Sequence, residues 1–489
     1  MKTKNGILSL VFFTISFVVF SQDGLFDISF ENDGYVITDI NGGDDIIYSV
    51  EQAFDEKLLI IGTTENTNLE TVILKYLPNG DIDLSFGNNG IVYPSYNMAF
   101  YNNTKLIINP DNSFFVLGSK EEDFFIAKHL YNGDLDNTFG VNGSITTNFD
   151  EDNFHTAILQ DDGKVVAVGR TSDAANNYQI MMVRYFSNGD LDPTFGNNGI
   201  ALYDAGGEFF RTRKVLLQND GKVLLQLAEY TNTPRKLVVY RFMPNGSIDN
   251  SFGNNGKIIV MEDTWLNGGS MALKPDGKII TTASNPDSGI TKINQYLTNG
   301  LIDVSFADNG EKIYNSNDFF TSKLFFKENR MLVYGHVSEF EGTTSALIRF
   351  TENGELDPAF GSNGSIHIDD FQSYDVIVQS DDKIVRVGST YWYEGIADFV
   401  LTRHSNSFLG TPTQNLTTFT FYPNPSKGIF NITNNLIVPE KSYQISDITG
   451  KIIQQGKLSS EQTQIDISQF ENGVYLFTSE GSTIRLLKN

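Results

Sequence analysis

Short apolar runs separated by polar turns recur along most of the chain. The runs hold about four to six residues rich in Val, Ile, Leu and Phe, and Asn-Gly, Asp-Gly or Pro bounds most of them. A helix needs a longer run with a 3.6-residue period, whereas short runs between such turns are typical of strands. Asn-Gly and Asp-Gly supply the positive φ that tight hairpin turns need. The pattern therefore predicts an all-β protein.

Three sequence elements each repeat seven times, with a period of about 55 residues. The first reads NGxxDxxFGxNG. The second is a polar turn leading into an apolar run, as in DGKVVAVG (162–169), and the third is an apolar strand that ends in a basic or polar residue, as in IMMVRYFSNG (180–189). The Asp and Phe of the first element are Asp27 and Phe30, Asp83 and Phe86, Asp136 and Phe139, Asp192 and Phe195, Asp249 and Phe252, Asp303 and Phe306, and Asp357 and Phe360. Such a period suits four short strands and their connections.

The seven units begin and end out of phase. The last copy of the third element (399–408) has no first element behind it, while an unmatched first element opens the chain at 23–34. An open array of sheets would expose edges that invite aggregation, and closure removes them. We therefore expect residues 22–408 to form a seven-bladed β-propeller whose N-terminal segment completes the last blade.

The repeated Asp and Phe are expected to be structural, because every unit carries them. The Asp can accept backbone N–H bonds in its turn, and the Phe can act as a wedge between blades, where burial contributes about 1.5–3 kcal/mol for each ring. Calcium is the alternative reading of the paired carboxylates Asp81/Asp83, Asp134/Asp136 and Asp190/Asp192. The first member of the pair is replaced elsewhere, by Leu25, Ser247, Leu301 and Glu355. We therefore expect no metal and no cofactor.

The two ends of the chain differ from the repeats. Residues 1–21 place Lys2 and Lys4 before an apolar stretch, which predicts a secretory signal cleaved before Gln22. A membrane anchor is the alternative, but the stretch is short for spanning, and we expect no transmembrane segment in the mature chain. Residues 409–417 have the composition of a linker, and the alternation in 418–489 predicts a small Ig-like β-sandwich.

Two resemblances rest on these motifs. The NGxxDxxFGxNG repeats over 23–408 resemble the delta-60 repeat of bacterial secreted proteins, which implies a propeller-like fold and no established activity. In the tail, YPNPSKGIFNI (422–432), ISDITGKII (445–453) and ENGVYLF (471–477) closely resemble the C-terminal sorting domain of the type IX secretion system of Bacteroidetes. That resemblance implies recognition by the type IX translocon, outer-membrane translocation, and a protein that is secreted or attached to the outer cell surface.

Composition excludes several classes of function. Lys+Arg 35 against Asp+Glu 60 gives a net charge of −25, which would repel nucleic acid and anionic membranes. The absence of cysteine removes disulfides, thiolate nucleophiles and Cys-ligated metals. The five histidines show no HExxH or paired ligand spacing, at His129, His155, His336, His367 and His404. We predict no catalytic residues, although the sequence leaves open whether the protein is an enzyme.

The clearest departures from the repeat are aromatic residues in expected loops: Tyr391, Trp392 and Tyr393 in one, and Trp265 in another. Flat aromatic side chains on loops suit sugar rings or partner surfaces, with local loop packing as the alternative. We expect a non-catalytic protein that binds a glycan or a protein through its propeller loops. The alternatives are a polysaccharide-active hydrolase with carboxylates at the propeller centre, and a structural surface protein.

Overall fold

The computed structural model describes two stretches of the chain. The first is residues 23–408 apart from 66–67, 99–103, 121–122, 149–152, 174–176, 208, 231–233, 265, 267, 286, 316–318, 340–341, 369–370 and 392–394. The second is 419–488 apart from 423–425, 435–440, 448–450, 459–461 and 480–481. The expected signal and linker lie outside these residues. The chain divides into two compact units, Met1–Phe408 and Leu409–Asn489.

The described residues of the first unit form seven four-stranded antiparallel sheets. Sheet 1 is β2 (Asp44–Gln52), β3 (Leu58–Glu65), β4 (Leu69–Tyr76) and β5 (Ile91–Val92). Sheet 2 is β6 (Lys105–Ile108), β7 (Phe114–Lys120), β8 (Asp123–His129) and β9 (Ser144–Thr147). Sheet 3 is β10 (Asn153–Leu159), β11 (Val165–Ser172), β12 (Tyr178–Tyr185) and β13 (Ile200–Gly207). Sheet 4 is β14 (Phe210–Leu217), β15 (Val223–Glu229), β16 (Arg235–Phe242) and β17 (Lys257–Asp263).

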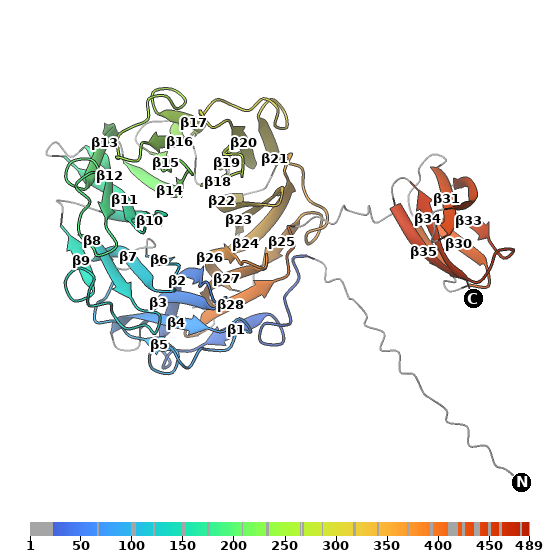
Figure 1. Cartoon of the computed structure of the whole chain (residues 1–489), viewed down its shortest axis with the longest axis horizontal. Helices are drawn as coiled ribbons and strands as arrows, with labels where there is room; N and C mark the ends of the chain where they lie inside the picture. The colour runs from blue at the N-terminus through green and yellow to red at the C-terminus, as the bar shows by residue number, and fades with distance from the viewer. Residues whose placement is uncertain are drawn as a thin grey trace, which may run out of the picture. The chain divides into compact units, whose positions relative to one another are not determined.

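The remaining sheets follow the same order, with one exception at the end. Sheet 5 is β18 (Gly268–Leu273), β19 (Ile279–Asn285), β20 (Ile290–Tyr296) and β21 (Glu311–Asn315). Sheet 6 is β22 (Phe319–Lys327), β23 (Arg330–Glu339), β24 (Gly342–Thr351) and β25 (Ser365–Ile368). Sheet 7 is β26 (Gln372–Val378), β27 (Ile384–Ser389), β28 (Phe399–His404) and, as its outer strand, β1 (Tyr35–Thr38). Figure 1 shows a propeller-like arrangement, in which the first strand of each sheet faces a common centre.

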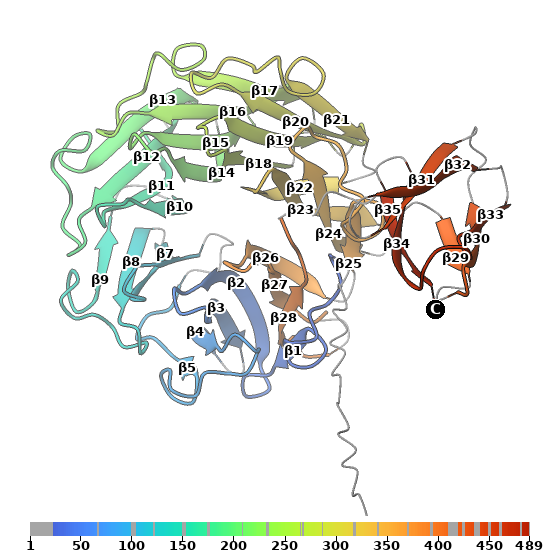
Figure 2. The same cartoon turned by 45° about the vertical axis from the view of Figure 1, so that its right-hand side comes forward.

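The N-terminal strand therefore completes the last sheet, as the phase of the repeats predicts. Tyr35 lies opposite Thr402 and Thr38 lies opposite Phe399 in an antiparallel pair. The strands β1 and β28 run side by side in Figures 1 and 2. The first strand of sheet 1, β2, in turn contacts β26 of sheet 7 and β6 of sheet 2. The expected pairing of the N-terminal segment with the last unit is confirmed.

In most units a backbone hydrogen bond links the turn to that of the next unit. The N–H of Gly196 donates to the Asn245 carbonyl at 2.8 Å, and equivalent bonds recur in other units. The N-terminal segment takes part at both of its ends. Gly361 N donates to Asp23 O at 2.9 Å, and Glu31 N donates to Asn79 O at 2.9 Å. The unmatched first element at 23–34 thus makes the same backbone contacts with its neighbours as the internal copies make with theirs.

The basic residue of the third element ties the repeated Asp to the next unit. Arg184 donates from Nε to Asp192 at 2.9 Å and from Nη1 to the carbonyl of Pro244 at 2.6 Å. Burial alone would raise the pKa of Asp192, but hydrogen bonds from Thr194 and the charge of Arg184 lower it to about 2. The same type of contact recurs in Lys128–Asp136, Arg241–Asp249, Gln295–Asp303, Arg349–Asp357 and Arg403–Asp27.

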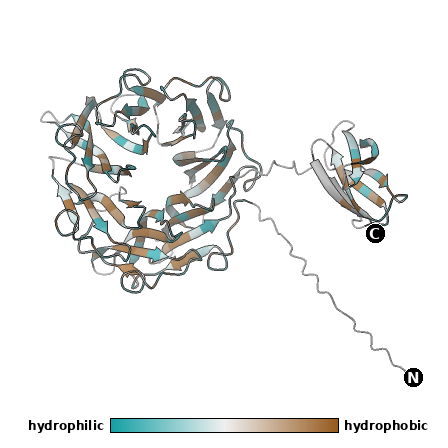
Figure 3. Cartoon of the chain, viewed as in Figure 1, coloured by the Kyte–Doolittle hydropathy of each residue, from teal (hydrophilic) through white to brown (hydrophobic). Residues whose placement is uncertain are grey.

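The repeated Phe side chains lie between units. All seven are almost fully buried, with exposed fractions of 0–4%. A Cβ added at Gly246 would lie 2.9 Å from Cζ of Phe195, so the next turn approaches the ring so closely that only glycine fits. The Arg184 guanidinium covers the same ring at 4.6 Å from its centroid. Figure 3 shows the apolar residues concentrated along the strands.

The second unit is a pair of sheets around one core. The three-stranded sheet is β29 (Phe419–Tyr422), β30 (Ile429–Asn434) and β33 (Gln462–Asp466). The four-stranded sheet is β32 (Ile452–Leu458), β31 (Lys441–Asp447), β34 (Gly473–Ser479) and β35 (Ser482–Lys488). Phe430 and Ile465 from the first sheet share a buried cluster with Ile445 and Phe477 from the second.

Replacing Arg403 by Ala should destabilise the first unit by about 2 kcal/mol, because it removes the buried guanidinium that bonds Asp27 and the Pro78 carbonyl, while Lys383 still pairs with Asp27. Urea unfolding measures the change. The matched control is Lys236→Ala, which breaks an exposed ion pair with Glu262 and should cost less than about 1 kcal/mol. An equal loss in the free energy of unfolding for the two variants would contradict a special role for Arg403.

Candidate functional site

The strand registers place the connections of each sheet on two opposite faces. In sheet 1, Gln52 pairs with Leu58 and Leu58 with Tyr76, so the turn after the first strand and the NGxxD turn share one end. Asp44 pairs with Glu65 at the other end. We call the first end the motif face. The other end, which carries the connections between second and third strands and between successive sheets, we call the loop face.

The motif face is occupied by the repeated Asp, Phe and Arg contacts. Their carboxylates are already hydrogen-bonded: Asp192 Oδ1 accepts the N–H of Thr194 at 3.0 Å, while Oδ2 accepts from Arg184. The connections of the loop face differ in length and sequence from unit to unit. Variable loops on a regular scaffold are where binding residues concentrate. The loop face is therefore the place to look for a functional site.

The aromatic residues singled out from sequence fall on this face only in part. Tyr391 is half-buried in the connection between β27 and β28. Trp265, Trp392 and Tyr393 lie outside the described residues. Whether these four side chains form one site therefore stays a prediction.

A different aromatic cluster lies on the loop side of sheets 3 and 4. Phe209 stands between β13 and β14, Tyr178 begins β12, and their ring centroids are 5.6 Å apart. Tyr230, just after β15, lies 6.0 Å from Phe209. The guanidinium of Arg170, in β11, lies 4.3 Å from the Phe209 centroid and 5.1 Å from that of Tyr178. These four residues, all half-buried, are called the aromatic–arginine cluster below.

The surroundings of the aromatic–arginine cluster are cationic. Arg213 donates from Nη2 to the Tyr230 hydroxyl at 2.6 Å. Burial, together with the charges of Arg170 and Arg211, lowers the pKa of His155 to about 3, so its ring is neutral at pH 7. Arg235 lies 5.2 Å from the Tyr230 centroid, so with Arg170, Arg211 and Arg213 four arginines gather here on a chain whose net charge is −25. Aromatic rings beside guanidinium groups suit a flat ligand that carries carboxylate or sulfate groups.

The sequence analysis did not identify this cluster, because it gave most weight to the two tryptophans and the tyrosines beside one of them. The informative segment was GEFFRTR (207–213), whose two Phe and two Arg interrupt the polar connection expected at that point. Tyr178 begins the third strand of sheet 3 and Tyr230 follows the second strand of sheet 4, and no spacing along the chain relates them to Phe209.

The first strands bring a second group of charges toward the centre. Lys105 pairs with Glu51 at 2.8 Å, and Lys323 pairs with Asp375. Burial, together with the positive charges of Lys323 and Lys105, lowers the pKa of the Lys214 amine to about 8. The carboxylates of Glu51 and Asp375 are therefore both ion-paired with lysine.

Among the described residues, one group of acidic side chains is close enough to hold a metal ion. Asp39, Asp45 and Asp398 each place one carboxylate oxygen within 4.8 Å of the others. Burial raises the pKa of Asp45 to about 7, and the charges of Asp39 and Asp398 act in the same direction. These residues come from β2 and from the segments flanking β1 and β28, and the repeats do not carry them.

Comparison with known families supports the two resemblances. Residues 420–488 match the family described as "Secretion system C-terminal sorting domain". Residues 55–86, 160–195 and 218–252 match the family described as "Domain of unknown function (DUF5122) beta-propeller". The chain joins a DUF5122 β-propeller region to a type IX sorting domain. No curated protein matches the sequence significantly.

The solved structures that match are distant from this chain in both sequence and structure. The polysaccharide lyase Uly1 is 9% identical with a TM-score of 0.47, over 80% of this chain and 94% of that one. Drosophila Semaphorin 2a is 8% identical with a TM-score of 0.45, over 96% and 99%. The PQQ-bound aldose sugar dehydrogenase from Streptomyces coelicolor is 11% identical with a TM-score of 0.37, over 63% and 95%. At such values the likeness carries no inference about activity.

The sorting domain indicates where the protein acts. The type IX system handles this domain and delivers the chain to the cell surface or into the medium. Within the described part of the chain, no helix has the length and apolar character needed to cross a bilayer. The DUF5122 match brings no activity with it.

Replacing Lys214 by Met should raise the melting temperature at pH 7 and much less at pH 10. An unfolded lysine has a pKa of about 10.4, whereas the folded Lys214 has a pKa of about 8, so its charged form destabilises the fold at pH 7. As the pH rises from 8 to 10 the folded amine loses its proton first, and that penalty disappears. Thermal unfolding at both pH values measures the effect, and an equal shift at pH 7 and pH 10 would assign it to packing instead.

Proposed function

We propose that the protein is a non-catalytic binding protein, exported by the type IX system, that captures an acidic glycan at its loop face. The ligand would lie on the aromatic–arginine cluster. Arg170 carries the proposal, since its guanidinium lies over the rings of both Tyr178 and Phe209. The apolar face of a sugar ring can pack on the aromatic rings, and a carboxylate or sulfate can pair with the arginines.

The proposed architecture follows the repeats. The seven sheets are the blades of a closed β-propeller spanning 22–408, behind a signal at 1–21. Residues 409–417 act as a linker, and 418–489 form an Ig-like sandwich. The β1–β28 pairing and the turn-to-turn hydrogen bonds on both sides of the N-terminal segment support closure. A rigid ring would hold the loops of sheets 3 and 4 in fixed positions, which limits the entropy lost on binding.

A polysaccharide-active hydrolase remains the competing proposal. Such an enzyme needs two carboxylates that flank the scissile bond, one protonated and one ionised. Glu51 and Asp375 face the centre from first strands, but each is paired with a lysine, and the Asp375–Lys323 pair contributes to a lowered pKa of Asp375 despite its burial. A general acid needs the opposite shift. This observation favours binding over hydrolysis.

Binding to an array of acidic and neutral glycans should show affinity for uronate- or sulfate-bearing chains. Tyr178→Ala and Phe209→Ala should each weaken that binding about tenfold, the effect of losing about 1.4 kcal/mol of ring contact. Arg170→Gln should weaken binding to acidic chains in particular and reduce its dependence on salt. Tyr391→Ala and Trp392→Ala are the matched loop-face comparisons and test the site expected from sequence.

Two results would contradict this proposal. Loss of binding in Trp392→Ala, with full binding in Tyr178→Ala, would move the site to the loop after β27. Release of reducing ends from a bound polysaccharide, abolished by Glu51→Gln or Asp375→Asn, would replace the binding protein by a hydrolase.

A further inference from the structure

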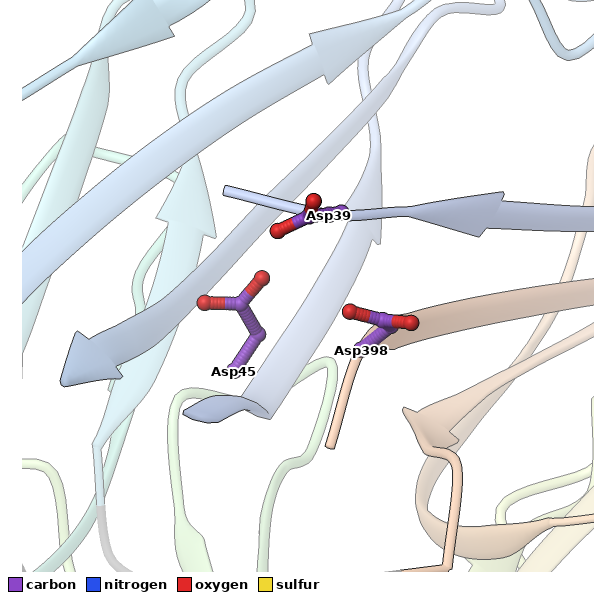
Figure 4. Close-up of side chains that lie close together, drawn as sticks. All are labelled: Asp39, Asp45 and Asp398. Atoms are coloured by element: carbon purple, nitrogen blue, oxygen red, sulfur yellow. The ribbon is translucent and has the colours of Figure 1, made fainter. Parts of the chain in front are cut away.

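Three acidic side chains meet where the first and last sheets adjoin. Asp39 directly follows β1, the strand that the N-terminus adds to sheet 7. Asp45 lies in β2 of sheet 1, and Asp398 directly precedes β28 of sheet 7. Figure 4 shows the three carboxylates directed toward one another from these three elements. The cluster thus lies at the seam between sheets 1 and 7, where the two ends of the first unit come together.

One oxygen of this cluster has no hydrogen-bond partner. Asp45 is fully buried, and its Oδ2 accepts the N–H of Ile40 at 2.7 Å. Its Oδ1 is also buried and, among the described residues, no donor reaches it in hydrogen-bond geometry. The Thr64 hydroxyl lies close enough to lower the pKa of the carboxyl, but it donates to the carbonyl of Ile40 at 3.2 Å. A buried carboxylate oxygen is costly to leave unpaired, so an orphan of this kind indicates a bound ion or water.

The repeated aspartates provide an internal contrast. Asp27 accepts from Arg403 Nε at 2.8 Å and from the N–H of Ser29, and its equivalents in other units are satisfied in the same way. Asp45 forms no ion pair within the described part of the chain. The seam therefore gathers negative charge without the protein cation that neutralises the motif aspartates.

The geometry suits a hard divalent cation with oxygen ligands. Calcium binds oxygens at about 2.3–2.6 Å, so two ligands of one ion lie at most about 5 Å apart. The 4.8 Å limit among the three carboxylate oxygens is compatible with that requirement. Calcium accepts irregular sets of six to eight ligands, whereas magnesium demands a near-ideal octahedron. Extracellular modules commonly bind calcium at millimolar levels, the setting to which the sorting domain delivers this chain.

We propose that Asp39, Asp45 and Asp398 bind one calcium ion that clamps the N-terminal strand and the first sheet to the last sheet. The ion links segments that are distant in the sequence, as a disulfide does in other exported proteins. This chain has no cysteine with which to form one. The site is independent of glycan binding at sheets 3 and 4.

Calcium titration of the exported chain, after treatment with EDTA, tests the site. Calorimetry should find one calcium per chain, and calcium should raise the melting temperature of the first unit by several degrees at constant ionic strength, with magnesium giving a smaller rise. Asp45→Asn and Asp398→Asn should abolish both effects. Without calcium these variants should melt at or above the wild-type temperature, because the clustered negative charge is reduced, and with calcium they should melt below it.

The matched control is Asp190→Asn, an exposed acid of the NGDLD turns, which should leave calcium binding unchanged. Three results would overturn the proposal. They are no change in the wild-type melting temperature at about 10 mM calcium, roughly tenfold above the dissociation constants of the weakest extracellular sites, a full calcium response in Asp45→Asn, or loss of the response in Asp190→Asn.

Discussion

The contact between Arg403 and Asp27 joins the two ends of the seven-sheet unit. The two residues are 376 positions apart in the sequence. The same guanidinium also donates to the carbonyl of Pro78, between β4 and β5 of sheet 1. Closing so long a loop costs chain entropy, which the chain must offset without a disulfide. It does so with a contact of the kind that recurs at most internal junctions. Closure of sheet 7 depends on this junction, because an unpaired last sheet would leave β28 as an exposed edge.

Repetition on one face leaves the other face free to vary. The repeated Asp, Arg and Phe residues satisfy one another between neighbouring units, so they offer little to a ligand. The connections on the opposite face make no such repeated contacts, so their lengths and sequences can differ from sheet to sheet. That division explains why Arg170, Tyr178 and Phe209 occur in one place only, while the Arg184–Asp192 contact recurs around the unit.

Sequence alone predicted the parts of the fold that repeat. The period, the strand character and the unmatched segment at 23–34 identified the pairing of β1 with β28 before any coordinates. The candidate sites were not predictable in this way. Asp39, Asp45 and Asp398 meet only because the ends of the unit adjoin, and Tyr178, Phe209 and Tyr230 come from separate segments of sheets 3 and 4. Trp265 and Trp392 stand out in the sequence because they are its two tryptophans. The rarity of a residue type does not show which residues lie close together in the fold.

Closure by the N-terminal strand is tested most directly by a cysteine pair at Val36 and Leu401, which lie opposite each other in β1 and β28. Opposed residues on neighbouring antiparallel strands have Cα atoms about 4.5–5.5 Å apart, within reach of a disulfide. Because the chain has no native cysteine, peptide mapping after mild oxidation gives an unambiguous answer. A closed unit predicts a disulfide within one chain for Val36→Cys/Leu401→Cys, and none for Val36→Cys/Val387→Cys, since Val387 lies one strand further in. Free thiols in the first variant, or disulfides only between chains, would contradict closure.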